Sequence, residues 1–265
     1  MTEPTQGAFT PRPGGFSPRP GAAPLGRMLA AQTAMELRLT LRNGEQLLIS
    51  MIVPLLLTVV LVTEPFISVS GGRRVDFFVP GILALAVMSA AFTGQAIATG
   101  FERKYGVLKR LGGTALPRSV LLLGKTGAVC CVELIQIVLI CLLGLALGWH
   151  PHGSPLAVAL LAFLGTAAFS GIGLLMAGTL RAETTLAAAN LVWFVLLFFG
   201  GVMFPLSKFP HALGEVLQYL PIAALSDGLR AVLADGSGPP VHDLATLVVW
   251  AAVSLGAAAA TFRWD

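Results

Sequence analysis

Residues 101–125, FERKYGVLKRLGGTALPRSVLLLGK, decide how this chain is folded. The stretch carries six of the chain's 17 lysines and arginines and joins two long apolar segments. Basic residues in a short loop beside a span resist translocation, so such a loop marks the cytoplasmic side of a membrane protein. We therefore predict that residues 101–125 form a cytoplasmic connection between two membrane spans.

The first half of this connection, Phe101–Leu111, contains no proline and predicts a short amphipathic helix at the membrane surface. Its apolar residues recur at helical spacing: Phe101, Tyr105, Leu108 and Leu111. Its charged residues occupy the other faces: Glu102, Arg103, Lys104, Lys109 and Arg110. Gly112, Gly113 and Pro117 would end the helix before the next span. A soluble partner could bind such a helix, and we expect it to approach closely at Gly106.

The composition of the chain excludes a soluble globular protein. Of its 265 residues, 55% are hydrophobic and 11% are charged, and the mean hydropathy is +0.82. The charges lie mainly outside the apolar segments, so the net charge of +4 fits loops that face membrane lipid. No pattern typical of nucleic-acid binding is present, and we expect no nucleic-acid partner.

The N-terminal part of the chain divides into a tail and a helix. Residues 1–26 contain six prolines and five glycines and are predicted to be a disordered cytoplasmic tail. Arg27–Arg42 lacks both residue types and predicts an interfacial helix, with an apolar face at Met28, Met35 and Leu39. Residues 27–265 then form a single membrane domain.

Six apolar segments are long enough, or nearly so, to cross a hydrocarbon core of about 30 Å. They are Leu47–Thr63, Phe77–Gly100, Val120–Gly148, Leu156–Leu180, Thr184–Phe204 and Leu244–Phe262. The expected fold is therefore an all-α polytopic membrane protein with six transmembrane helices. With this topology, thirteen of the 17 basic residues lie on the side of the two termini, so both termini are expected to be cytoplasmic. The expected location is the plasma membrane of a bacterium.

The last external connection, Pro205–Asp243, is too long for a simple link. Its alternating apolar and polar residues predict two short helices separated by Pro221. These helices would dip into the outer leaflet or lie on it, forming a re-entrant segment.

Residues 119–126, SVLLLGKT, differ from a phosphate-binding loop at the first glycine. Four consecutive apolar residues here begin a membrane span, whereas a phosphate loop needs a glycine-rich turn after a buried strand. We therefore expect no bound nucleotide or other cofactor, and interpret Lys125 as an anchor that extends to the cytoplasmic membrane surface. Any ATP must then bind to another chain.

Glu133 is the acidic residue placed deepest in a predicted span, and Gln136 lies one helical turn further on. An unpaired carboxylate in lipid is costly, so a functional role is one interpretation. A structural contact with a neighbouring helix or subunit is the other. Gln136 could share a hydrogen bond with Glu133.

Other reactive residue types form no convincing site. The three cysteines lie in one apolar segment, and His150 and His152 flank a proline with no nearby carboxylate or cysteine. We expect no metal site here. No hydrolytic motif or paired catalytic carboxylates are present, so catalytic residues are not expected.

The chain resembles the permease subunits of type-2 ATP-binding-cassette exporters, particularly those like the daunorubicin-resistance permeases. Two motifs carry the resemblance. The first is ERKYGVLKR, residues 102–110, followed by Thr114, Leu116, Pro117 and Lys125, which looks like the family's cytoplasmic coupling segment. The second is similar to the re-entrant external segment before the last span: Gly200, Gly201, Phe204, Pro205, Leu206, Pro210, Leu220, Pro221, Asp227, Gly228, Leu229 and Arg230.

The resemblance implies a permease that dimerises, with itself or with a second permease, and pairs with a separate cytoplasmic ATPase that binds ATP and magnesium. It also implies outward transport of an amphipathic drug-like or lipid-like molecule, as in antibiotic efflux. Two other functions stay open: a secondary transporter driven by protons through Glu133, and a membrane assembly factor that transports nothing.

Overall fold

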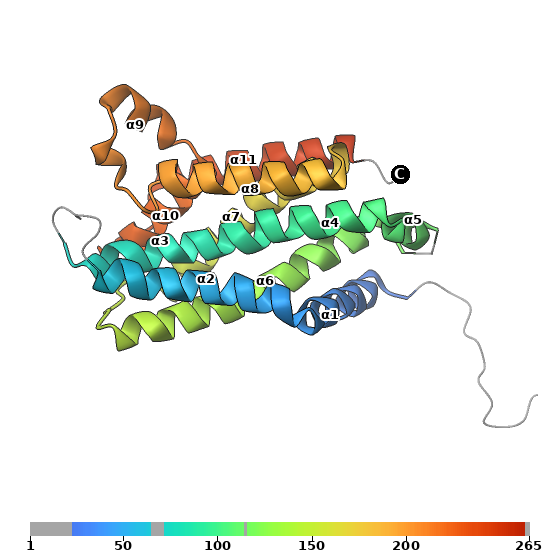
Figure 1. The fold of residues 1–265 in the computed structure, drawn as a ribbon, viewed down its shortest axis with the longest axis horizontal. Coiled ribbons are helices and arrows are strands. Elements are labelled where there is room, and N and C mark those ends of the chain that lie inside the picture. The colour runs from blue at the N-terminus through green and yellow to red at the C-terminus, as the bar shows by residue number, and fades with distance from the viewer. Residues whose placement is uncertain (1–22, 65–71, 114–115, 263–265) are drawn as a thin grey trace, which may run out of the picture.

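The computed structural model describes residues 23–64, 72–113 and 116–262, and within them every regular element is a helix. The helices lie mostly side by side along one direction (Figure 1). In chain order they are α1 Leu25–Arg42, α2 Gly44–Thr63, α3 Arg74–Met88, the π-helix η1 Ser89–Gly94, α4 Gln95–Lys104, α5 Val107–Gly112, α6 Arg118–Ala146, α7 Pro155–Thr179, α8 Ala182–Phe199, the 3-10 helix η2 Leu206–Lys208, α9 His211–Leu217, α10 Pro221–Leu233 and α11 Val241–Thr261.

The predicted all-α membrane fold is confirmed. Within the described residues, five helices are long and apolar enough to cross a membrane: Arg74–Lys104, which joins α3, η1 and α4, Ser119–Ala146, and α7, α8 and α11. The apolar part of α2, Ser50–Thr63, is shorter. Helices α9 and α10 meet at an angle of 88°, so the predicted pair of short helices is present. Pro221 is the first residue of α10, a position where proline's missing N–H costs nothing.

Most helix boundaries differ from the predicted ones by a few residues, and two of these differences are informative. Helix α1 begins at Leu25, inside the segment expected to be disordered, while residues 1–22 lie outside the described part of the chain. Helix α8 ends at Phe199 instead of Phe204, because Gly201 adopts a left-handed conformation with φ of 75° and turns the chain.

Helix α3 lies at the centre of the bundle. From Phe78 to Met88 every residue of α3 is buried, as expected of a helix that is apolar all round.

Helix α7 packs closely on its neighbours because it carries glycines. An added Cβ atom at Gly171 would come within 2.1 Å of Ser254 Oγ in α11, and one at Gly173 within 2.8 Å of the Phe92 carbonyl oxygen in η1. These glycines therefore let α7 approach α11 and η1 closely.

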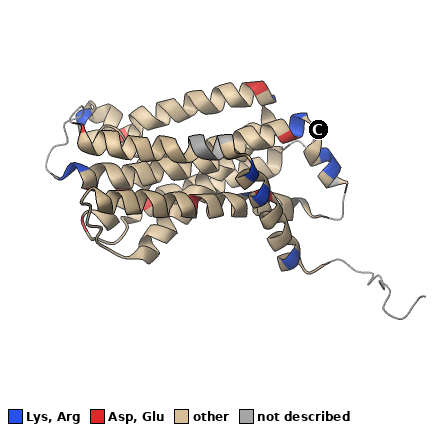
Figure 2. Ribbon diagram, turned by 60° about the horizontal axis from the view of Figure 1, so that its bottom comes forward, with Lys and Arg blue, Asp and Glu red and all other residues tan. Residues whose placement is uncertain are grey.

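The bundle has two different ends. Helices α1 and α5 and the end of α11 lie at one end, which we call the basic end; α9 and α10 lie towards the other, which we call the α10 end (Figure 1). Charged residues gather mostly at these ends, with uncharged helix between them (Figure 2). This arrangement places α1 and the end of α11 on the same side, as an even number of crossings requires.

Candidate functional site

The predicted helix over Phe101–Leu111 is interrupted in the structure. Helix α4 ends at Lys104, Gly106 adopts the left-handed conformation with φ of 70°, and α5 begins at Val107. The Gly106 N–H donates to the Arg103 carbonyl oxygen at 3.0 Å, a bond that closes the end of α4. The prediction of one continuous helix was wrong because Gly106 reaches a backbone conformation that other residues rarely adopt.

Three side chains of the α4–α5 junction and of α5 are exposed. Tyr105 is 65% exposed, and Lys109 and Arg110 are also exposed. Leu108 is completely buried and fixes α5 to the bundle. We call Tyr105, Lys109 and Arg110 the α5 surface; it is the part of the predicted coupling segment that a partner could contact.

The charged residues at the end of α4 contact other helices of the same chain. Arg103 donates to the Leu180 carbonyl oxygen between α7 and α8, and Lys104 forms an ion pair with Glu183 at the start of α8. Lys104 also lies 5.7 Å from the centroid of the Phe101 ring and 5.8 Å from that of Tyr105. These contacts hold α4 against α8.

Lys125 is buried, so its interpretation as an anchor extending to the membrane surface was wrong. Its ammonium group lies 3.0 Å from Glu36 Oε1 and 2.5 Å from Glu102 Oε2, and the residue is 5% exposed. One lysine of α6 thus joins a carboxylate of α1 to a carboxylate of α4. We call Glu36, Glu102 and Lys125 the ion triad.

The triad forms because α1 packs directly on α6. An added Cβ at Gly124 would lie 2.4 Å from Gln32 Cγ, and one at Gly127 would lie 2.9 Å from Thr33 Oγ1. Two glycines one turn apart therefore let α1 cover Lys125. The polar residues Gln32 and Glu36 face inward and form a hydrogen bond of 2.8 Å, while Leu39 stays 56% exposed.

Two polar stripes at helical spacing were not among the predicted features. Helix α1 carries Gln32, Glu36 and Thr40, with Asn43 directly after its last residue, and α4 carries Gln95, Thr99 and Glu102. Residues four and three apart share one face of a helix, so each stripe could have been found from spacing alone. The spacing alone does not show that the two stripes face a common space.

A cavity of about 250 Å³ lies between these stripes. Its lining comes from α1, α2, η1, α4 and α6, and it includes all members of the ion triad. The π-helix contributes Ser89, Ala90 and Gly94. An extra residue per turn inside a long helix often marks a functional position.

Glu133 and Gln136 contact different partners, so the hydrogen bond considered between them is absent. Thr166 of α7 donates to Glu133 Oε2 at 2.6 Å, and Gln136 donates to the Ser50 carbonyl oxygen of α2 at 2.9 Å. Glu133 is 4% exposed and does not line the cavity. Both residues connect neighbouring helices.

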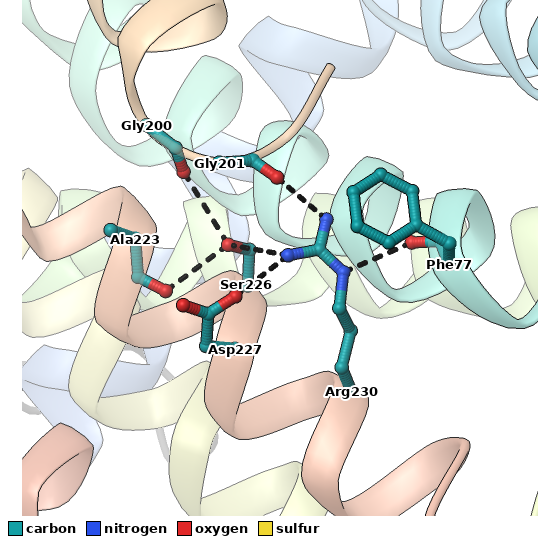
Figure 3. Close-up of polar contacts among 7 residues, drawn as sticks. All are labelled: Phe77, Gly200, Gly201, Ala223, Ser226, Asp227 and Arg230. Atoms are coloured by element: carbon teal, nitrogen blue, oxygen red, sulfur yellow. Dashed lines mark hydrogen bonds and ion pairs between the residues drawn. The ribbon is translucent and has the colours of Figure 1, made fainter. Parts of the chain in front are cut away.

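The predicted external motif forms a second polar centre around Arg230 (Figure 3). The guanidinium group donates to the carbonyl oxygen of Phe77 at 3.1 Å and to that of Gly201 at 2.8 Å. It also contacts Asp227 Oδ1 at 2.7 Å and lies 3.9 Å from the centroid of the Phe77 ring. Arg230 therefore joins α10 to α3 and to the turn after α8.

The remaining residues of the external motif shape the chain around this centre. Pro205 precedes η2, Pro210 precedes α9 and Pro221 begins α10. Gly81 in α3 leaves room for the guanidinium group, since an added Cβ would lie 2.8 Å from Arg230 Nη2. The motif thus builds a packed structural corner.

The described residues offer no site for a metal or a phosphate loop. Residues 119–126 are part of helix α6, and no three His, Cys, Asp or Glu side chains in the described ranges are placed to hold a metal ion. The polar features of this bundle are therefore the α5 surface, the ion triad with its cavity, the Glu133 contact and the Arg230 centre.

Comparison with known families identifies the chain. A family model described as ABC-2 family transporter protein matches residues 72–260, from the start of α3 almost to the end of α11. The match therefore includes the α4–α5 junction and the Arg230 centre, and leaves out α1 and α2. A search of curated proteins finds no match. The chain belongs to the ABC-2 family of transporter proteins and is a multi-pass membrane permease of an ABC transporter.

Proposed function

We propose that this permease exports a hydrophobic or amphipathic molecule across the plasma membrane, driven by ATP hydrolysis in a separate cytoplasmic ATPase. Membership of the ABC-2 family implies association with such an ATPase. The observation that carries the proposal is the α5 surface, an exposed aromatic and basic surface held in place by the buried Leu108. Antibiotic-like and lipid-like molecules are the proposed cargo.

The proposed orientation places the basic end in the cytoplasm. Thirteen of the 17 basic residues belong to that side in the six-span topology, and the positive-inside rule then assigns both termini to the cytoplasm. The ATPase would meet the α5 surface from this side. The α10 end would face outward.

Movement of α5 has a continuous route into the bundle. Helices α3 and α4, with η1 between them, form one apolar span from Arg74 to Lys104. At the basic end Glu102 joins this span to Lys125, and at the α10 end the Phe77 carbonyl oxygen accepts from Arg230. A displacement of α5 would therefore act on a helix that is attached at both ends.

The two other functions have weaker support. A proton-driven transporter would need Glu133 beside a path for protons, whereas Glu133 accepts a hydrogen bond from Thr166 and lies outside the cavity. A membrane assembly factor would have no need of the α5 surface as a site of ATPase binding. The test below separates this factor from the exporter.

Charge reversal on α5 tests the proposal. The variant Lys109→Glu with Arg110→Glu should bind the ATPase at least tenfold more weakly in co-purification, because two exposed charges at the contact are reversed. ATP-dependent export from the same cells should fall with it. The thermal midpoint of the permease alone should not change, since both side chains are exposed.

A matched control reverses Arg27 and Arg38, two exposed bases of α1 at the same end. This control should keep ATPase binding within about twofold of the original chain. Equal losses in the two variants would indicate diffuse charge attraction, and unchanged binding in the α5 variant would contradict the proposal.

A further inference from the structure

The cavity at the basic end holds polar side chains that nothing in the described part of the chain satisfies. Gln95 is 4% exposed, and neither its Nε2 nor its Oε1 atom has a hydrogen-bond partner among the described residues. Thr99, one turn further along α4 and 1% exposed, has an unpartnered hydroxyl oxygen. Both residues line the cavity. Buried amides and hydroxyls without partners are rare because each costs free energy, so these two favour a ligand.

The charge of the cavity is unbalanced. Two carboxylates, Glu36 and Glu102, share the single ammonium group of Lys125. Glu36, Glu102 and Lys125 are the charged side chains of the cavity lining, so the ionised triad gives the cavity one net negative charge. A positively charged group entering the cavity would offset it, whereas an anion would be repelled.

Besides the polar residues Thr40, Asn43, Ser50 and Ser89, the lining has an apolar part. It includes Leu39, Ala90, Ala98, Ala128, Val129 and Val132. Leu39 is 56% exposed, so the cavity opens beside the apolar face of α1 that is turned away from the bundle. The volume of about 250 Å³ lies just under the roughly 300–1,000 Å³ of pockets for drug-sized ligands. It therefore suits the charged part of a molecule whose apolar part extends through this opening.

From these observations we infer that the cavity between α1, α2, η1, α4 and α6 binds amphipathic organic cations, with Glu36 and Glu102 attracting the positive charge and Gln95 and Thr99 forming hydrogen bonds. This inference rests on the proposed function, because it identifies organic cations as the class of molecule exported. The site lies within one copy of the chain.

Binding of two ions with the same apolar body and opposite charge tests the inference. The full chain is placed in nanodiscs of phosphatidylcholine, which carries no net charge, and binding of labelled 4-phenylbutylammonium and 5-phenylpentanoate, which share one phenylbutyl group, is measured against empty nanodiscs. The cation should bind saturably and at least tenfold more tightly than the anion. Equal binding of both ions would show a site that reads only apolar shape and would overturn the inference.

Two pairs of variants locate the binding. Glu102→Gln should weaken cation binding at least tenfold, while Glu183→Gln, which removes a carboxylate from the same end but outside the cavity, should leave it unchanged. Thr99→Val should weaken binding of a hydrogen-bonding amine such as propylbenzylamine, while Thr58→Val, a buried threonine that donates to Pro54 and lies outside the cavity, should not. If Glu102→Gln fails to fold, Gln95→Leu replaces it as the test. This variant keeps all three ionic groups and should also weaken amine binding.

Equal losses in Glu102→Gln and Glu183→Gln would place the attraction on the surface of the basic end and contradict a cavity site. The assay uses no ATP, so it is independent of the proposed export. Selective cation binding without ATP-driven movement of the cation would support the proposed binding site and contradict the proposed export. Export of other molecules by a permease that binds no cation would support the proposed export and contradict the proposed cation site.

Discussion

Each end of the bundle holds one basic side chain among polar partners, Arg230 partly buried and Lys125 buried, but the two surroundings differ. At the α10 end the Arg230 guanidinium has two backbone carbonyl oxygens, one carboxylate, one hydroxyl and an aromatic ring as partners. At the basic end Lys125 has two carboxylates beside a cavity that also holds the unpartnered Gln95. One centre is filled and the other is open.

This difference separates a structural role from a functional one. A guanidinium group has five N–H donors in a fixed plane, so it can satisfy several backbone groups at once and fix their positions. An ammonium group on a flexible stem, shared between a carboxylate of α1 and one of α4, can rearrange when one of these helices moves. We therefore expect Arg230 to determine stability and the ion triad to determine coupling between α1, α4 and α6.

The largest expected effect is at Arg230. Arg230→Met should lower the free energy of unfolding by about 3 kcal/mol, because it leaves the carbonyl oxygens of Phe77 and Gly201 and the carboxylate of Asp227 without their donor. Thermal melting of the purified permease measures this loss. Arg110→Met, an exposed arginine at the basic end, is the control and should change stability by less than about 0.5 kcal/mol. Similar melting of both variants would remove the distinction between the two ends.

A smaller loss is expected at Lys125. Lys125→Met should cost about 2 kcal/mol, because water entering the adjacent cavity can partly solvate the two carboxylates left behind. A double-mutant cycle with Glu102→Gln should give an interaction energy of about 1 kcal/mol. Additive losses would mean that the two residues do not interact, and a loss as large as that of Arg230→Met would show that the triad is as structural as the α10 end.

The smallest expected effect is at the α4–α5 junction. Gly106→Ala should cost about 1 kcal/mol, because a Cβ atom is unfavourable at φ of 70° although no atom lies within 4 Å of it. Gly113→Ala is the matched control: its φ is −82° and its added Cβ would be 3.5 Å from the nearest atom, so stability should hold or rise slightly. Equal melting temperatures would contradict the left-handed turn. The predicted loss of stability in Gly106→Ala is the opposite of the effect at an ordinary helical glycine, where replacement by alanine stabilises the protein.

Much of the architecture could be predicted from the chain alone. The apolar segments predicted the spans, and the alternating apolar and polar residues on either side of Pro221 predicted the pair α9 and α10. The candidate site was predicted less completely. The segment around Glu102 was identified, but the break at Gly106 and the burial of Lys125 were missed. A glycine can also continue a helix, so its presence alone does not predict a break, and the burial of a lysine depends on how the helices pack.

The sequence by itself determined that the protein crosses the membrane, which residues form its helices and where its basic charge concentrates. These properties follow from hydropathy and local periodicity, which neighbouring residues in the chain decide. Only the tertiary structure decided that Lys125 joins Glu36 to Glu102, that Gln95 faces a cavity and that Arg230 reaches Phe77, 153 positions away. Such contacts depend on how closely helices approach, and that distance is set by the glycines on α3 and α6 that receive a distant side chain or helix.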